Sequence, residues 1–343
     1  MASADNPILN SPYEEPTRHY ATDAQGNLNY RDVRPGRRVF TADVPQVPIG
    51  QSDQGSIFDL NDFPSQYGEH LINTLRDELR SWRQAGYRGV SSRVTRDLLQ
   101  YWFANPERAA HQKLFFAQQE AVEAAIWLNE VAEKSNTGTH VQNQLRQRQA
   151  TASDDPANHL PRIAFKMATG SGKTVVMACL ILYHYFNRRE YRNDTRYVDY
   201  FLVLAPGITI RDRLNVLLPD GQSQQPSAAA DYYRQRHLVP PAYQHALGEL
   251  AHRLVITNYH EFLPRVLGGN KRTPFDGKLG DDGRKVESRE DESQMLRRVL
   301  GGFKAGRRLL VINDEAHHCY LPRARGRDTE LDNSATENER AAV

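Results

Sequence analysis

The chain has 343 residues, 39% of them hydrophobic and 25% charged, and its 44 Lys and Arg residues almost balance its 42 Asp and Glu residues. A chain of this length can form a large core and about two domains, but its balanced charge does not indicate a nucleic-acid-binding protein, so such binding would need a local basic face. The apolar runs are too short for a membrane helix, and the start of the sequence lacks a signal-peptide pattern. The two cysteines, Cys179 and Cys319, are too few for a disulfide framework or a zinc site with four ligands. These features predict a cytoplasmic protein with no membrane partner.

The first 110 residues contain two regions of different composition. Residues 1–65 are rich in Pro, Gly, Asn and Asp and lack a helical period, which predicts an extended leader. Residues 66–110 place Leu71, Ile72 and Leu75 on one side of a helix and predict a helical N-terminal region.

Residues 111–343 predict an α/β domain. A long amphipathic helix is expected from Lys113, and exposed loops are expected at 135–160 and 268–292, where large apolar residues are scarce. Short apolar strands alternate with helices over the rest, a pattern typical of a parallel sheet covered by helices on both faces. The expected strands are 162–168, 197–207, 252–260 and 307–318, and the expected helices are 172–189, 208–218, 240–250 and 292–303.

The segment "KMATGSGKT" lies between an expected strand and an expected helix. Backbone N–H groups and the positive end of a helix dipole then converge on one point, which suits a polyphosphate. Gly170 and Gly172 would let the backbone approach the phosphates, Lys173 would reach the β- and γ-phosphates, and the Thr174 hydroxyl would bind Mg²⁺. The alternative is a tight turn with a surface lysine, and Met167 occupies the position of the first glycine in the usual pattern.

The segment "LLVINDEAHHCY" ends an apolar strand with an acidic pair. Ligands bind at the carboxyl ends of strands in parallel sheets. Asp314 would hold Mg²⁺, and Glu315 would orient and deprotonate an attacking water. The alternative is a solvated strand end.

Together these segments resemble superfamily 2 helicases and translocases with DEAD/DEAH boxes. Asp314 to His317 reads as a DEAH box, and a small residue often replaces the first glycine in that superfamily, so Met167 is no objection. The sequences of the two segments are most similar to the restriction (R) subunit of type III restriction–modification enzymes. The resemblance implies a RecA-like P-loop NTPase lobe at 111–343 with ATP and Mg²⁺ as ligands.

The resemblance also assigns roles to single residues. "FFAQQEAVEAAIWL" is similar to a Q-like motif, which places Gln118 against adenine, and His317 would couple the nucleotide and nucleic-acid sites. The implied catalytic residues are Lys173, Asp314 and Glu315. The implied ATP-binding residues are Gln118, Thr169, Gly170, Ser171, Gly172, Lys173 and Thr174.

Two further segments are similar to motifs that contact nucleic acid. "GITIRDRL" and "VITNYH" would place Thr209, Arg211, Thr257 and Asn258 on the phosphates of the tracked strand. Short polar and guanidinium groups can hold a backbone without reading bases. The alternative is a helix cap at Thr209 followed by a solvated helix face.

The family's motor needs a second RecA-like lobe, and its nuclease domain follows the motor. Neither is expected within this chain, so we expect weak ATPase activity, no endonuclease activity, and a second lobe supplied in cis or in trans. The implied partners are duplex DNA and a modification methyltransferase subunit. Two other functions stay open: a non-motor module that binds ATP or DNA, and an RNA-directed helicase lobe, because backbone contacts do not distinguish the sugars.

Overall fold

The computed structural model describes residues 8–22, 27–39, 71–151, 160–219, 231–267 and 288–316, with the side chains of 148–151 left out. The chain divides into two compact units. The first unit contains residues 1–201, 214–254 and 302–310, and the second contains residues 202–213, 255–301 and 311–343.

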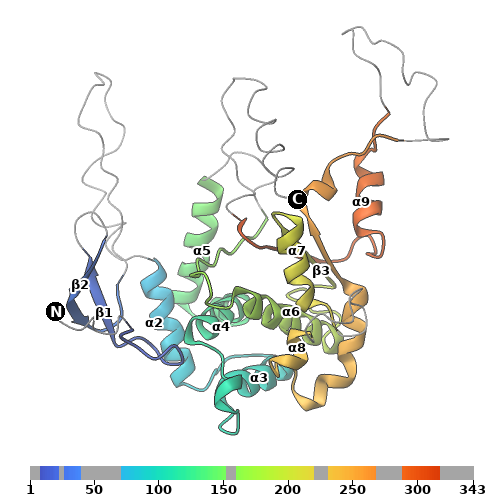
Figure 1. Cartoon of the computed structure of the whole chain (residues 1–343). Helices are drawn as coiled ribbons and strands as arrows, with labels where there is room; N and C mark the ends of the chain where they lie inside the picture. Colours follow the sequence, from blue (N-terminus) through green and yellow to red (C-terminus); the bar gives the residue numbers. More distant parts are fainter. Residues whose placement is uncertain are drawn as a thin grey trace, which may run out of the picture. The chain divides into compact units, whose positions relative to one another are not determined.

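The leader forms an antiparallel hairpin, drawn in blue in Figure 1. Strand β1 (Arg18–Thr22) pairs with β2 (Leu28–Pro35), and the register shifts between Tyr20 and Ala21. Gly36 adopts φ +81°, and its N–H donates to the Thr17 carbonyl over 2.7 Å, which closes the open end of the hairpin. Only residues 8–22 and 27–39 of the region 1–65 are described, so its assignment as an extended leader stays a prediction.

Helices follow the hairpin, as the apolar spacing predicted. Helix α2 (Leu71–Gln84) buries Leu79 and Trp82. Helix α3 (Arg93–Leu99) begins at the cap residue Ser92, whose hydroxyl accepts from the Thr95 N–H over 3.2 Å. It continues into the π-helical turn η1 (Gln100–Ala104), and the short turns η2 (Ala110–Gln112) and η3 (Ala132–Lys134) flank helix α4 (Phe116–Glu130).

The prediction of an exposed loop at 135–160 was wrong over most of its length. Helix α5 occupies Asn136–Thr151, and the Ser135 hydroxyl accepts from the Gly138 N–H over 3.0 Å at its start. The segment lacks an apolar stripe, but Gln, Arg and Leu are good helix formers. Among the described side chains of this helix, Val141 is the buried apolar one that attaches it to the core, and Gly138 is buried beside it. Scarcity of apolar residues therefore did not exclude a helix.

Helix α6 (Lys173–Glu190) is the central helix of the first unit. Its apolar residues are buried on every side rather than along one stripe, which is typical of a core helix. Cys179 is fully buried there, and burial raises the pKa of its thiol to about 12, so the thiol is not reactive near neutral pH.

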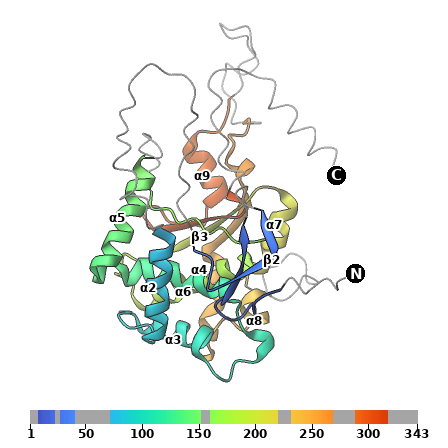
Figure 2. The same cartoon turned by 90° about the vertical axis from the view of Figure 1, so that its left-hand side faces the viewer.

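A three-stranded parallel sheet has the strand order β4–β3–β5. Its strands are β4 (Leu254–Asn258), β3 (Tyr200–Ala205) and β5 (Leu309–Asn313), as the alternating pattern predicted, and β3 is labelled in Figure 2. The intervening elements are α7 (Ile208–Leu214), η5 (Asn215–Leu217), α8 (Tyr232–Gln235), η6 (Pro241–Arg253), η7 (Tyr259–Phe262) and α9 (Glu292–Leu300). The predicted helix at 240–250 is therefore a run of 3₁₀ turns.

The predicted strand at 162–168 does not form. These residues have no regular secondary structure and are mostly exposed, with Ile163 51% exposed. An apolar segment becomes a strand only where another backbone lies beside it and accepts its hydrogen bonds, and the described sheet does not include this segment. The expected loop at 268–292 lies outside the described residues up to position 287. None of the described helices combines the length and apolarity needed to cross a lipid bilayer.

Candidate nucleotide site

The glycine-rich loop of the first unit leads directly into α6. Gly170 and Gly172 have φ of +78° and +82°, a left-handed conformation that favours glycine. Within the loop, the Ser171 N–H and hydroxyl both donate to the Ala168 carbonyl, over 3.2 and 2.6 Å. Gly172 is the N-cap of α6, so Lys173 is its first residue. Backbone N–H groups at the amino end of an α-helix point out of the helix body, an arrangement that favours an anion.

Gln118 lies against this loop. Its side-chain amide donates to the Ser171 carbonyl over 2.9 Å and accepts from the Phe115 N–H over 3.0 Å, and the residue is 5% exposed. A Cβ on Gly172 would come within 2.1 Å of the Gln118 Nε2 atom. The structure therefore joins two segments that are 53 residues apart, and the sequence resemblance had assigned both of them to one site.

This contact gives a test of the loop in the absence of nucleotide. Gly172→Ala should destabilise the chain more than Gly170→Ala, because both carry the strain of a left-handed residue, roughly 1 to 3 kcal/mol, but only the first meets Gln118. Chemical denaturation of the two variants measures the difference. Adding Gln118→Ala to Gly172→Ala should remove the excess, and equal stabilities of the two single variants would contradict the contact.

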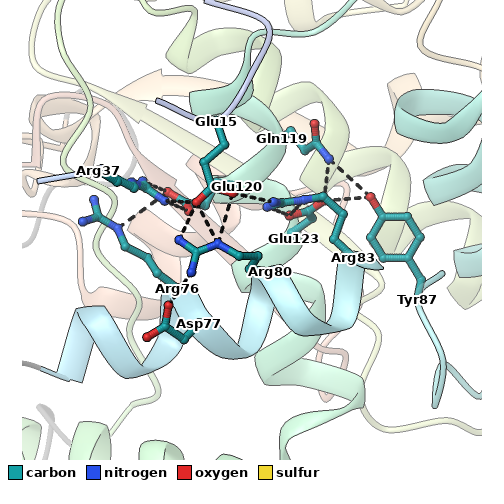
Figure 3. Close-up of polar contacts among 10 residues, drawn as sticks. All are labelled: Glu15, Arg37, Arg76, Asp77, Arg80, Arg83, Tyr87, Gln119, Glu120 and Glu123. Carbon is teal, nitrogen blue, oxygen red and sulfur yellow. Dashed lines mark hydrogen bonds and ion pairs between the residues drawn. The ribbon is translucent and has the colours of Figure 1, made fainter. Parts of the chain in front are cut away.

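Helix α4, which presents Gln118, is fixed on α2 through a buried carboxylate (Figure 3). Glu123 is 0% exposed and accepts from the Arg83 guanidinium over 2.6 Å, the Tyr87 hydroxyl over 2.7 Å and the Gln119 amide over 2.7 Å. Burial, with the carboxylate beside it, raises the pKa of Tyr87, so its hydroxyl stays a donor. A buried charge is tolerated when it is paired and hydrogen-bonded in this way.

The N-terminal segment contacts both α2 and α4 (Figure 3). Glu15 binds Arg80 over 2.6 Å, and this ion pair lowers the pKa of the Glu15 carboxyl. Arg37 hydrogen-bonds the Glu120 carboxylate through both terminal nitrogens. The Phe116 N–H donates to the Pro12 carbonyl over 2.7 Å, and Arg37 and Arg83 lie over the Phe116 ring at 5.4 and 4.9 Å. Residues far apart in sequence therefore set the position of the first turn of α4.

No sequence signal identified this network. Its arginines and glutamates have the spacing of an ordinary solvated helix face, and their partners come from other segments. The only local indication was Phe116, the second residue of the Q-like motif, because an aromatic ring beside arginines is a favourable stacking surface.

The acidic pair lies in the second unit, directly after β5. The Asp314 N–H donates to the Leu204 carbonyl of β3 over 2.9 Å, and the Glu315 N–H donates to the Asp314 carboxylate over 3.1 Å. Both residues are partly exposed. Glu315 has φ +49°, a left-handed conformation that is uncommon for a residue with a side chain. Backbone strain of this kind is concentrated at functional sites.

The predicted nucleic-acid contacts also lie in the second unit. Thr209 is exposed in the first turn of α7, and the Arg211 guanidinium donates to Asp212 over 2.9 Å. Thr257 and Asn258 are 7% and 6% exposed at the end of β4, and the Asn258 side chain accepts from the Glu261 N–H over 3.2 Å, as the cap of η7. Their contact with nucleic acid stays a prediction. His317 lies outside the described residues.

The geometry can be compared with known proteins. A family model described as type III restriction enzyme, res subunit, matches residues 112–329, which is more than half of the chain. The matched span includes Gln118, the glycine-rich loop and the acidic pair. Comparisons with curated proteins and with solved structures gave no match.

Proposed function

Because the chain belongs to the family of the type III restriction enzyme res subunit, we propose that residues 111–343 form the first RecA-like lobe of a DNA translocase that binds and hydrolyses ATP. The contact of Gln118 with the glycine-rich loop carries this proposal. It links the residue expected to recognise the base to the residues expected to hold the phosphates. In the same proposal, residues 1–65 and 66–110 are N-terminal additions to the lobe.

The loop residues fit a magnesium-bound triphosphate. Nothing lies within 4 Å of a Cβ built on Gly170, so the backbone there is open to a ligand. Lys173 places a cation at the amino end of α6, where the helix dipole adds to its attraction for anions. Thr174 follows with a hydroxyl suited to Mg²⁺. The ligands that Mg²⁺ prefers are hydroxyl, carboxylate, phosphate and water oxygens.

The chemical roles follow from the residue types. Thr169 and the loop glycines supply N–H groups to the phosphates, Ser171 keeps the loop in shape through its bonds to Ala168, and Lys173 neutralises charge on the phosphates. Mg²⁺, when bound, withdraws charge from the phosphate oxygens. In this proposal Asp314 orients the metal through its carboxylate, and Glu315 takes the proton of the attacking water.

Coupling to nucleic acid is the finer part of the proposal. His317 transmits the state of the nucleotide, and Thr209, Arg211, Thr257 and Asn258 contact the backbone of duplex DNA. Since type III restriction enzymes pair a res subunit with a modification subunit, a methyltransferase is the proposed protein partner. A second RecA-like lobe completes the motor, and the proposed cellular location is the cytoplasm.

The binding step is tested with Lys173→Ala. We expect its affinity for Mg-ATP, measured by calorimetry, to fall at least tenfold, because a charge-assisted contact to phosphate is lost, worth roughly 1.5 to 3 kcal/mol. The control is Lys113→Ala, which removes an exposed lysine outside the loop. Equal affinities for the variant and the unaltered chain would contradict the site assignment.

The motor function is tested by the dependence of turnover on nucleic acid. Duplex DNA should increase the ATPase rate, and duplex RNA at the same salt concentration should not. Comparison at one salt concentration is needed because phosphate contacts depend steeply on ionic strength. Tight ATP binding with no stimulation by either duplex would instead favour a non-motor binding module, and stimulation by RNA alone would favour an RNA-directed lobe.

A further inference from the structure

A basic hollow of about 600 Å³ lies in the first compact unit. Its walls come from the end of α6, the start of β3, the end of η6 and the segment before β5. Six of its lining residues are cationic: Arg188, Arg189, Arg192, Arg253, Lys304 and Arg307.

Two carboxylates line the hollow, and both already have partners. Asp199 accepts from the Arg188 guanidinium over 2.9 and 3.2 Å and from the Arg308 N–H over 3.2 Å. Glu249 pairs with Arg189. These pairs fix the walls, and each neutralises one arginine. Arg188 and Arg189 are the basic residues in the last turn of α6. The helix dipole favours a positive charge at this end of the helix, and the two ion pairs add to that effect.

The remaining cations give the hollow a surplus of positive charge. Arg192 and Lys304 are exposed, and neither forms an ion pair with any carboxylate in the described ranges. Arg307 reaches Asp199 only at 4.0 Å, and Arg253 lies over the Tyr185 ring at 5.9 Å. The helix dipole does not account for Arg192 or Lys304, because both lie outside α6. Cations held together in a concave site attract an anion of several charges.

The hollow is distinct from the nucleotide loop. Helix α6 has 18 residues, with Lys173 at its first position and Arg188 and Arg189 in its last turn, so about 25 Å separates its two ends. The hollow also lies where β3, β4 and β5 begin, whereas the glycine-rich loop precedes α6. A ligand in the hollow therefore does not occupy the proposed ATP site.

We propose that this hollow binds the phosphate backbone of a nucleic acid as a second contact, separate from the nucleotide site. Arginine forks suit phosphate oxygens, and such contacts position a backbone without reading its bases. A protein partner is less suited, because the lining in the described part of the chain consists of charged residues apart from Tyr200, His252 and Gly302, whereas protein interfaces bury an apolar centre. The choice of nucleic acid as the source of phosphate rests on the proposed function.

The test measures binding of a fluorescent DNA duplex to the full chain by anisotropy, without ATP, over a series of salt concentrations. The variant Arg192→Ala/Lys304→Ala removes two exposed cations of the hollow. The control Arg93→Ala/Arg146→Ala removes two exposed arginines from α3 and α5. For the first variant we expect affinity to fall roughly tenfold or more and the slope of log affinity against log salt to become shallower by about two, because each lost phosphate contact reduces it by about 0.9.

Each other outcome has a defined meaning. Equal losses in both double variants, or no loss in either, would overturn the proposal, because the effect would not belong to the hollow. If the hollow variant loses affinity for inorganic triphosphate or poly-glutamate but keeps its affinity for DNA, the ligand is a free polyphosphate or an acidic protein instead. Lys173→Ala should keep the DNA affinity, so failure of the ATP site and failure of the hollow are distinguishable.

Discussion

Replacing Glu130 with leucine is expected to lower the free energy of unfolding by about 3 to 5 kcal/mol. Glu130 is 0% exposed, and one of its carboxylate oxygens accepts from Thr95 over 2.7 Å and from Tyr183 and Tyr197 over 2.9 Å each. Leucine would leave these hydroxyl donors without that acceptor in a site from which water is excluded. A buried donor left unpaired costs roughly 1 to 3 kcal/mol.

The measurement is denaturant-induced unfolding of Glu130→Leu beside two controls. Glu133→Leu makes the same chemical change at an exposed position three residues later and should alter stability by less than about 0.5 kcal/mol. Glu130→Gln keeps an accepting oxygen and should lie between the two. A loss below about 1 kcal/mol for Glu130→Leu would mean that the three hydroxyls find other acceptors, and the network would then be incidental to stability.

Glu315→Gln is expected to reduce the rate of ATP hydrolysis by about 10²- to 10⁴-fold, the usual contribution of a positioned general base. The amide keeps the size of the side chain but cannot take a proton from water. Because the proposed contacts with the phosphates come from the glycine-rich loop and Lys173, affinity for Mg-ATP should change little. Single-turnover hydrolysis with DNA present measures the rate, and calorimetry measures the affinity.

The variant Glu315→Gly separates chemistry from backbone strain. Glycine adopts the left-handed conformation of this position, φ +49°, without a side-chain penalty, so Glu315→Gly should unfold at a higher denaturant concentration than the unaltered chain. Its hydrolysis rate should fall as far as that of Glu315→Gln. A variant that becomes more stable but loses turnover is expected wherever a strained backbone conformation is kept because the function needs it. A Glu315→Gln variant that hydrolyses ATP at the unaltered rate would exclude Glu315 as the base.

The elements predicted best from sequence are those whose signals are local. Helix α6 begins at Lys173 because a glycine in a left-handed conformation precedes a run of apolar residues, and both features can be read from adjacent positions. Strand β5 ends at Asn313, and this end can also be read from adjacent positions, because the apolar run changes there to the acidic pair. The contact between Gln118 and Ser171 could not be derived from spacing. It was expected only through resemblance to a family.

Features that depend on distant partners were missed or misassigned. Residues 162–168 have the composition of a strand but are not part of the sheet in the described residues. Helix α5 has the composition of a loop but begins with a cap and is attached by Val141. The ion pairs of Glu15 and Glu123 join segments 65 and 40 residues apart. Residue type specifies what such groups can bind, but only the fold specifies which partner is present.

The pairing of Glu123 with Arg83 and Tyr87 has a consequence for where the molecule can be cut. Both partners precede residue 112, where the match to the family model begins. A shortened chain that starts at residue 112 would keep every expected nucleotide motif. It would, however, leave the Glu123 carboxylate without Arg83 and Tyr87 and remove α2, on which helix α4 packs. The start of the family match is therefore not expected to be a border of cooperative folding. Residues ahead of position 112 therefore have a structural role, because they cover helix α4.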